Sequence, residues 1–178
     1  TEEEMTDIVQ KWRKASPHIK KYWSKLDDAV RMAIQGVPAR LDRNMAVYRD
    51  GEVLFIRLPN GRSIAYVQPV IMDGQISYMG LNQTTRQWTR ITTWGGKLTE
   101  NVVQSIARDC LCDTLATLEA ENFRPVMHVH DEVICEVPED EADARLARLK
   151  EIMATPPAWA PDIVLTADGF QSDYYKKD

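Results

Sequence analysis

Apolar residues near the start of the chain recur at helical spacing and predict a pair of helices. The second of these stretches has an apolar position every three or four residues: Ile19, Tyr22, Trp23, Leu26, Val30 and Ile34. Ser16-Pro17 separates it from the first, because proline suits the first turn of a helix and disrupts its interior. Gly36-Val37-Pro38 ends the second stretch. We therefore predict a helical pair over residues 2–35.

The pattern changes to short apolar and polar runs between residues 44 and 93, which is typical of strands. Pro59-Asn60-Gly61 separates two of these runs, and Asn-Gly favours a tight hairpin because both residues tolerate a positive φ. Asp73-Gly74 marks a second turn. These features predict an antiparallel meander with strands at residues 53–58, 62–67, 75–81 and 86–93.

Helical spacing returns over residues 98–121, where a wide apolar stripe predicts a long helix. The stripe comprises Leu98, Val102, Val103, Ile106, Cys110, Leu111, Leu115 and Leu118. Two apolar strands follow within residues 125–137, and then an amphipathic helix from Pro138 and a last strand at 163–166. Because strands and helices are segregated along the chain, we predict an α+β fold, with an antiparallel sheet packed on helices. The expected divisions are residues 1–36 (helical pair), 37–96 (meander) and 97–178 (long helix and final hairpin).

Composition indicates a folded globular protein, because 44% of the 178 residues are hydrophobic and 28% are charged. No run approaches the roughly 20 apolar residues of a membrane helix, and the acidic start lacks the apolar core of a signal peptide. The three cysteines lack Cys-x-x-Cys spacing and indicate free thiols in a reducing compartment. We therefore expect a cytoplasmic protein that does not bind a membrane.

Charge is distributed unevenly around the net value of −5. Net acidity argues against sequence-independent binding to nucleic acid, yet residues 8–26 contain six basic residues and no acidic one. Residues 74–99 contain three basic residues and again no acidic one. This asymmetry permits a basic groove on an acidic body, with an ordinary solvated face as the alternative.

Four polar residues of the long helix project within one narrow sector, away from the apolar stripe. They are Lys97, Asn101, Gln104 and Arg108, and each carries a hydrogen-bond donor. The sector is either a ligand-binding face or a plain solvent-exposed face.

Three consecutive ionisable residues, His130, Asp131 and Glu132, interrupt the apolar strands of residues 125–137. Burying such charges is costly, so we expect a hairpin tip that lifts them out of the sheet. Adjacent carboxylates repel each other, and Mg²⁺ binds one or two carboxylates together with substrate phosphates. Asp131 and Glu132 therefore predict half of a metal site, to be completed by a carboxylate from another strand. Alternatively, His128 and His130, two apart on a strand, are zinc ligands of a hydrolase.

The order of these elements resembles the C-terminal palm of family A DNA polymerases, the DNA polymerase I type. Two blocks are specific: Gln104 to Asp109 on the long helix, and Val126-x-x-x-His130-Asp131-Glu132-Val133 in the hairpin. Leu58 to Arg62 is similar to the family's Gly-Arg segment, and residues 1–30 are similar to the helices that follow the fingers. Residues 95–101 and 167–170 are similar to phage members in particular. The resemblance spans essentially the whole chain.

The resemblance implies a role for each matching residue. Asp131 is a catalytic metal ligand, Glu132 is an outer or occasional ligand, and His130 contacts the primer terminus. Gln104 faces the minor groove of the terminal base pairs, where every pair presents acceptors. Lys97, Asn101 and Arg108 contact the primer-template beside it. The family usually has Asn four positions before the glutamine, where this chain has Glu100.

Two motifs of the family do not occur in this sequence. One is the metal-binding Asp in an Asp-x-Ser-x-x-Glu context, and the other is the fingers helix whose Arg, Lys and Tyr-Gly pair bind the incoming nucleotide. We therefore expect the chain to begin after the second motif and not to polymerise alone. It is then a fragment, or a split subunit completed by another chain, with an exposed apolar surface where the missing part docks.

Once completed, the palm would support Mg²⁺-dependent nucleotidyl transfer at a two-metal site, with primer-template DNA and dNTP as partners. A non-catalytic module of the same fold, which binds DNA or a partner protein, stays an alternative.

Overall fold

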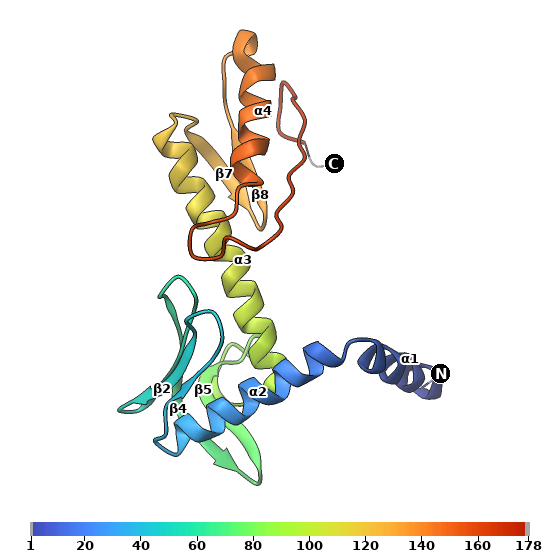
Figure 1. The fold of residues 1–178 in the computed structure, drawn as a ribbon, viewed down its shortest axis with the longest axis vertical. Coiled ribbons are helices and arrows are strands. Elements are labelled where there is room, and N and C mark those ends of the chain that lie inside the picture. The colour runs from blue at the N-terminus through green and yellow to red at the C-terminus, as the bar shows by residue number, and fades with distance from the viewer. Residues whose placement is uncertain (1, 177–178) are drawn as a thin grey trace. The chain divides into compact units, whose positions relative to one another are not determined.

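The computed structural model describes residues 2–176 and has the expected α+β composition (Figure 1). Its helices are α1 (Glu2–Ala15), α2 (Pro17–Ile34), α3 (Gly95–Ala120), the short 3₁₀ helix η1 (Glu139–Glu141) and α4 (Ala142–Met153). Its strands are β1 (Ala39–Arg40), β2 (Ala46–Asp50), β3 (Val53–Arg57), β4 (Ser63–Met72), β5 (Gln75–Leu81), β6 (Trp88–Thr93), β7 (Pro125–Val129) and β8 (Glu132–Cys135). The chain divides within α3 into two compact units, the first ending at Gln104 and the second beginning at Ser105.

The helical pair at the start of the chain is confirmed, with its break at Ser16. Pro17 occupies the first turn of α2, where its missing N–H leaves no helical hydrogen bond unmade. The buried residues of α2 recur at helical spacing and form one face: Leu26, Ala29, Val30 and Ala33. Ile19 lies outside this face and is exposed.

The predicted antiparallel meander is confirmed, but it has six strands in the order β1 to β6 where four were predicted. The additional strands are β1 and β2, and β4 extends beyond its predicted end to Met72. The hairpin between β3 and β4 closes where predicted: the amide of Gly61, at φ 91°, donates to the Leu58 carbonyl at 2.9 Å. One face of the sheet is buried, and α2 packs on β1 to β4 (Figure 1). Fully or almost fully buried on this face are Val47, Leu54, Ile56, Tyr66 and Ile76. Along β3 the side chains alternate between buried and partly exposed, as expected for a strand with one face on the core.

The start of α3 is anchored on α2. The backbone N–H of Gly95 donates to Asp27 Oδ1 at 2.9 Å, so an acidic side chain from another helix satisfies one of the free N–H groups at this helix end. The other carboxylate oxygen, Asp27 Oδ2, accepts from Arg31 Nε at 2.6 Å. Gly95 lies so close to α2 that a Cβ atom there would be 2.1 Å from the Trp23 carbonyl oxygen. Glycine is therefore required at this contact.

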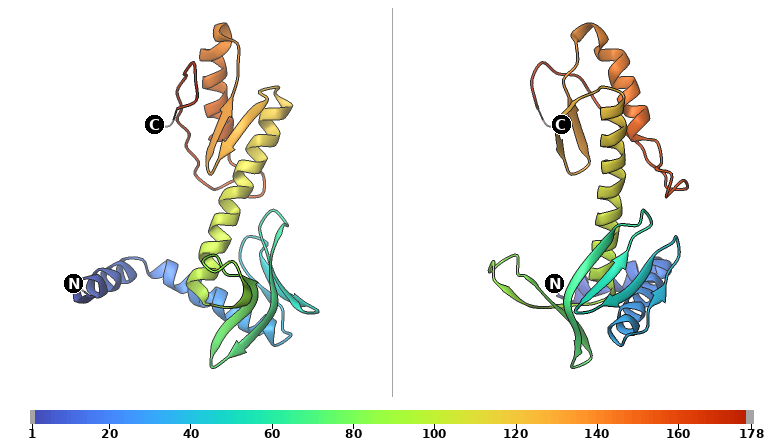
Figure 2. Two further views of the ribbon diagram at one scale, coloured as in Figure 1. Left: turned by 180° about the vertical axis from the view of Figure 1, so that it is seen from behind. Right: turned by 90° about the vertical axis from the view of Figure 1, so that its left-hand side faces the viewer.

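The second unit places the β7–β8 hairpin beside α4 and the C-terminal part of α3 (Figure 2). Leu118, Phe123 and Ile152 form its buried core, with the partly buried Val133, Cys135 and Leu149 packed against them. The Arg145 guanidinium lies over the Phe123 ring, 5.1 Å from its centroid. Two of the packed residues come from β8, so the core holds the hairpin against the helices.

Two expectations for these elements are wrong. Residues 163–166 form no strand: no described strand pairs with them, and Val164 is 88% exposed. An isolated extended segment without a hydrogen-bonded neighbour is not a strand, whatever its propensity. Val103 lies outside the buried stripe of α3 and is exposed, whereas Leu98, Val102, Cys110 and Leu118 are buried as predicted.

Within residues 2–176 no helix combines the length and apolarity that crossing a membrane requires. All three cysteines are free thiols, and burial raises the pKa of Cys110 and of Cys135.

Candidate functional site

The predicted acidic tip is confirmed as a two-residue turn between β7 and β8. Val129 pairs with Glu132, which leaves His130 and Asp131 to form the turn. His130 has a positive φ of 53°, a conformation that two-residue hairpin turns require and that glycine or asparagine usually supplies. A side chain held in this region stores about 1–3 kcal/mol of strain, and such strain concentrates at functional sites.

Asp131 and Glu132 are not part of the core of the second unit. Both residues are exposed, and neither side chain forms a hydrogen bond or ion pair within the described part of the chain. Their oxygens are the type of ligand that Mg²⁺ prefers. Across residues 4–176 no three His, Cys, Asp or Glu side chains form a group able to hold a metal ion. The turn therefore offers one or two ligands, not a complete set.

The two histidines of the alternative zinc site do not share a strand face. His128 lies on β7 opposite Val133 and is exposed. Since β7 ends at Val129, His130 belongs to the turn and the alternation of the strand does not reach it. The expected His-x-His arrangement on one face is therefore wrong.

We call Lys97, Asn101, Gln104 and Arg108 the donor sector of α3. The acidic residue Glu100 forms hydrogen bonds with two of these four side chains. Glu100 accepts from Lys97 Nζ at 2.8 Å and from Gln104 Nε2 at 3.4 Å. The i, i+3 and i, i+4 spacings of these pairs are a signal in the sequence that could have identified the interaction. Lys97 and Gln104 are both exposed, so the interactions lie at the surface of α3.

Asn101 and Arg108 differ in whether the side chain already donates a hydrogen bond within the chain. Asn101 is half-buried, and its Nδ2 donates to the Tyr66 hydroxyl of β4 at 2.9 Å. Burial raises the pKa of Tyr66 to about 12, and the oxygen of this neutral phenol accepts the bond. Arg108 is exposed and has no hydrogen-bond partner among residues 2–176. No local pattern links Tyr66 to Asn101, because 35 positions separate them.

The chain is similar to part of a viral enzyme. It is 39% identical over 184 aligned residues to a protein of Bacillus phage SP02 named DNA polymerase. The alignment covers 99% of this chain and 28% of the phage protein, so the chain spans somewhat more than a quarter of that relative. No protein-family model matches the chain, and no solved structure matches it significantly. Along nearly its whole length, therefore, the chain is similar to one part of a DNA polymerase.

Proposed function

We propose that the chain is the C-terminal palm portion of a family A DNA polymerase and supports nucleotide addition to a primer 3′-hydroxyl. The observation that carries this proposal is the end of the β7–β8 hairpin, where His130 and Asp131 form the turn and Glu132 begins β8, in a hairpin held by the core of the second unit. The similarity to a phage DNA polymerase over 99% of the chain supports it.

Asp131 and Glu132 would hold Mg²⁺ in this proposal, with Asp131 as the direct ligand. When bound, Mg²⁺ ions at such a site neutralise charge on the attacking hydroxyl and the leaving pyrophosphate. The chain's contribution is positional. Glu132 pairs with Val129 in the hairpin ladder, and the turn holds its two residues between the paired strands. His130, next to Asp131, would contact the primer terminus.

The donor sector of α3 would contact primer-template DNA. Gln104 would donate to minor-groove acceptors, which occur on every base pair, so this contact tests the shape of the pair without reading its sequence. Exposed Lys97 and Arg108 would approach phosphates, while Asn101 acts through its bond to Tyr66.

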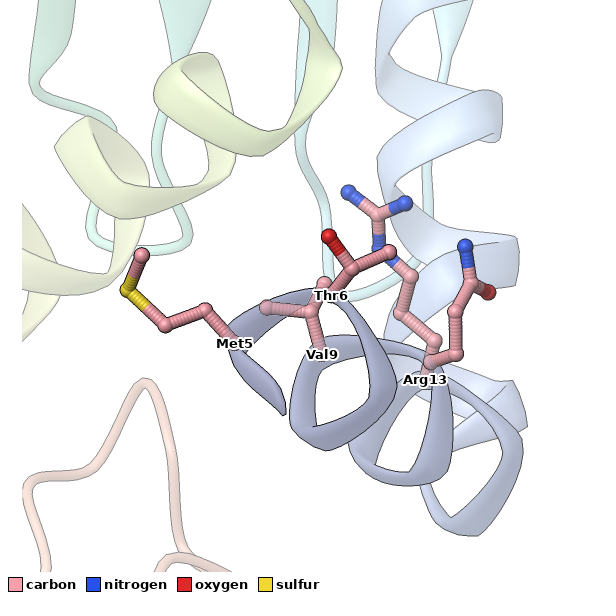
Figure 3. A pocket seen from close by; sticks show the side chains of 5 residues that line it. Met5, Thr6, Val9 and Arg13 are labelled. Atoms are coloured by element: carbon pink, nitrogen blue, oxygen red, sulfur yellow. The ribbon is translucent and has the colours of Figure 1, made fainter. Parts of the chain in front are cut away.

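The remaining parts of the active site would come from another segment or chain with the first and second motifs. An exposed apolar surface on α1 fits such docking: Met5 and Ile8 are 60% and 65% exposed, and Val9 and Trp12 are also exposed. Figure 3 shows Met5, Thr6, Val9 and Arg13 along one side of this helix, where they line a shallow hollow.

Primer extension tests this proposal. With primer-template DNA, dNTP and Mg²⁺, the chain alone is expected to add no nucleotide. After it is combined with, or fused to, a segment that supplies the thumb, the fingers and the first motif, extension is expected. Failure of every folded assembly that binds primer-template would contradict the proposal, as would synthesis by the isolated chain.

Substituting Glu100 with glutamine is expected to strengthen binding to duplex DNA. The change removes a negative charge from the donor sector and releases Lys97 from its ion pair, so we expect several-fold tighter binding at low salt. Fluorescence anisotropy with a labelled primer-template measures it. Glu119→Gln, which alters another exposed glutamate of α3, is the matched control and should leave the affinity unchanged. Unchanged or weaker binding by Glu100→Gln would remove this sector from the DNA-binding surface.

A further inference from the structure

The sheet of the first unit has a second face that no helix of this unit covers. Strand alternation separates it from the buried face that packs on α2. We call it the open face and define it by these residues of β2 to β6: Tyr48, the exposed Asp50, Val53, Phe55, Arg57, Ala65, Val67, Met79 and Arg90. Most of them are partly or largely exposed, in contrast to Leu54 and Ile56 on the buried face.

Two aromatic rings form the centre of the open face. Tyr48 and Phe55 are directly opposite each other on β2 and β3, and their rings stack with centroids 5.4 Å apart and planes 26° apart. Ala65 of β4 lies opposite Phe55 on its other side and is exposed. Because alanine has only a methyl group, β4 brings no large side chain over the ring. A flat ligand would continue the stack from Phe55 on this side.

Two arginines lie on the same face, Arg57 beside Phe55 on β3 and Arg90 three strands away on β6. Arg57 follows Phe55 by two residues, and its Nη2 donates to Asn44 Oδ1 at 2.8 Å. Arg90 is opposite Met79, and its Nη1 donates to the Gln68 carbonyl at 3.1 Å. Each bond uses one side of a guanidinium that has five donors, which orients the group. Arg57 Nε is itself buried and has no partner among the described residues, so its remaining Nη donors are the ones that would meet a ligand.

The charge of this part of the chain favours an anionic ligand. Residues 39–93 contain seven arginines against four acidic residues, although the whole chain has a net charge of −5. Tyr48 and Phe55 are partly exposed. Arginine next to accessible aromatic rings is the combination that holds unpaired nucleic-acid strands, because bases stack on the rings and phosphates meet the guanidinium groups. In a duplex the base faces are covered by their neighbours, so these rings suit a single strand.

We propose that the open face binds single-stranded DNA, with bases stacked on Phe55 and Tyr48 and phosphates held by Arg57 and Arg90. The strand is identified as DNA because of the proposed polymerase function, and the binding itself depends on no metal ion or nucleotide. Because every base has a π-face, binding at this surface would tolerate any sequence.

Removing the aromatic rings tests the stacking. With the complete 178-residue chain, labelled oligothymidylate and EDTA, Phe55→Leu and Tyr48→Leu are each expected to weaken binding about tenfold in fluorescence anisotropy. Phe55→Tyr retains an aromatic ring and should bind as the original chain does. Tyr78→Leu, a tyrosine that packs edge-on against the buried Tyr66, is the matched control and should leave binding unchanged. Circular dichroism confirms that each variant is folded.

Salt dependence tests the arginines separately. Each phosphate contact to a single strand contributes about 0.7 to the slope of log affinity against log salt concentration. The double variant Arg57→Gln, Arg90→Gln should therefore lower this slope by about 1.4.

Several results would overturn the proposal: no binding by the folded chain, leucine variants that bind normally, or duplex DNA that competes equally well at this face. A protein segment that covers the face would also overturn it, seen as protection of Phe55 and Tyr48 in the assembled polymerase whether or not DNA is present. The assay omits Mg²⁺ and dNTP, so its failure is distinct from failure of the polymerase proposal.

Discussion

Asp131→Asn in the assembled polymerase is expected to reduce nucleotide addition by about a thousandfold or more, or about 4 kcal/mol of transition-state stabilisation. Asparagine keeps the shape of the side chain and removes the charge that would hold Mg²⁺. The side chain is exposed and forms no contact that stabilises the described chain, so the free energy of unfolding should change by less than about 0.5 kcal/mol. Single-turnover primer extension measures the rate, and anisotropy shows that primer-template still binds.

The matched control is Asp140→Asn, the same change at another exposed aspartate of the second unit, in η1. It should leave the rate unchanged. Glu132→Gln should reduce the rate of nucleotide addition less than Asp131→Asn does and more than Asp140→Asn does, because an outer metal ligand contributes less than a direct one. If Asp131→Asn extended primers normally, the chain would be a non-catalytic module that binds DNA or a partner. Lost DNA binding together with lost synthesis would instead assign Asp131 a role in binding.

Gly95→Ala is expected to destabilise the first unit by about 2–4 kcal/mol, the largest effect on stability that we expect from a single methyl group. The added Cβ would lie 2.1 Å from the backbone oxygen of Trp23 and 2.8 Å from its carbonyl carbon. Backbone atoms cannot move aside as the end of a side chain can, so α2 and the start of α3 must separate. That shift would also lengthen the hydrogen bond from Gly95 to Asp27.

Urea unfolding followed by tryptophan fluorescence measures this effect, because Trp23 and Trp94 contact each other edge-on, 5.4 Å apart, beside the altered position. Gly169→Ala is the control: its Cβ would meet only the terminal methyl Leu146 Cδ1, at 3.1 Å, which is able to rotate away. We expect less than about 1 kcal/mol for it. An equally small loss at Gly95 would show that the two helices are not held by this contact.

Most elements of the fold were predictable because local patterns encode them. Helical periodicity and the Ser16-Pro17 break identified α1 and α2, and Asn60-Gly61 identified the hairpin between β3 and β4. The last strand was not predictable in this way. Residues 163–166 have the composition of a strand, but a strand exists only if a neighbour pairs with it, and apolar spacing carries no information about that neighbour.

Some features of the candidate site were likewise predictable from the sequence, and others required the structure. Its acidic tip follows from the sequence alone, since three ionisable residues between apolar strands are expected at a hairpin end. His130 and Asp131 form the turn, and Glu132 is the first residue of β8. The availability of the α3 donors required the folded chain. Asn101 is committed to Tyr66, a residue 35 positions away, and the open face of the sheet exists because strand register places Arg90 on the same side as Phe55. Apolar periodicity and turn residues reflect interactions between residues that are close in the sequence. The contacts of Asn101 and Arg90 instead depend on how distant segments pack. That packing determines which polar groups remain available to bind a ligand.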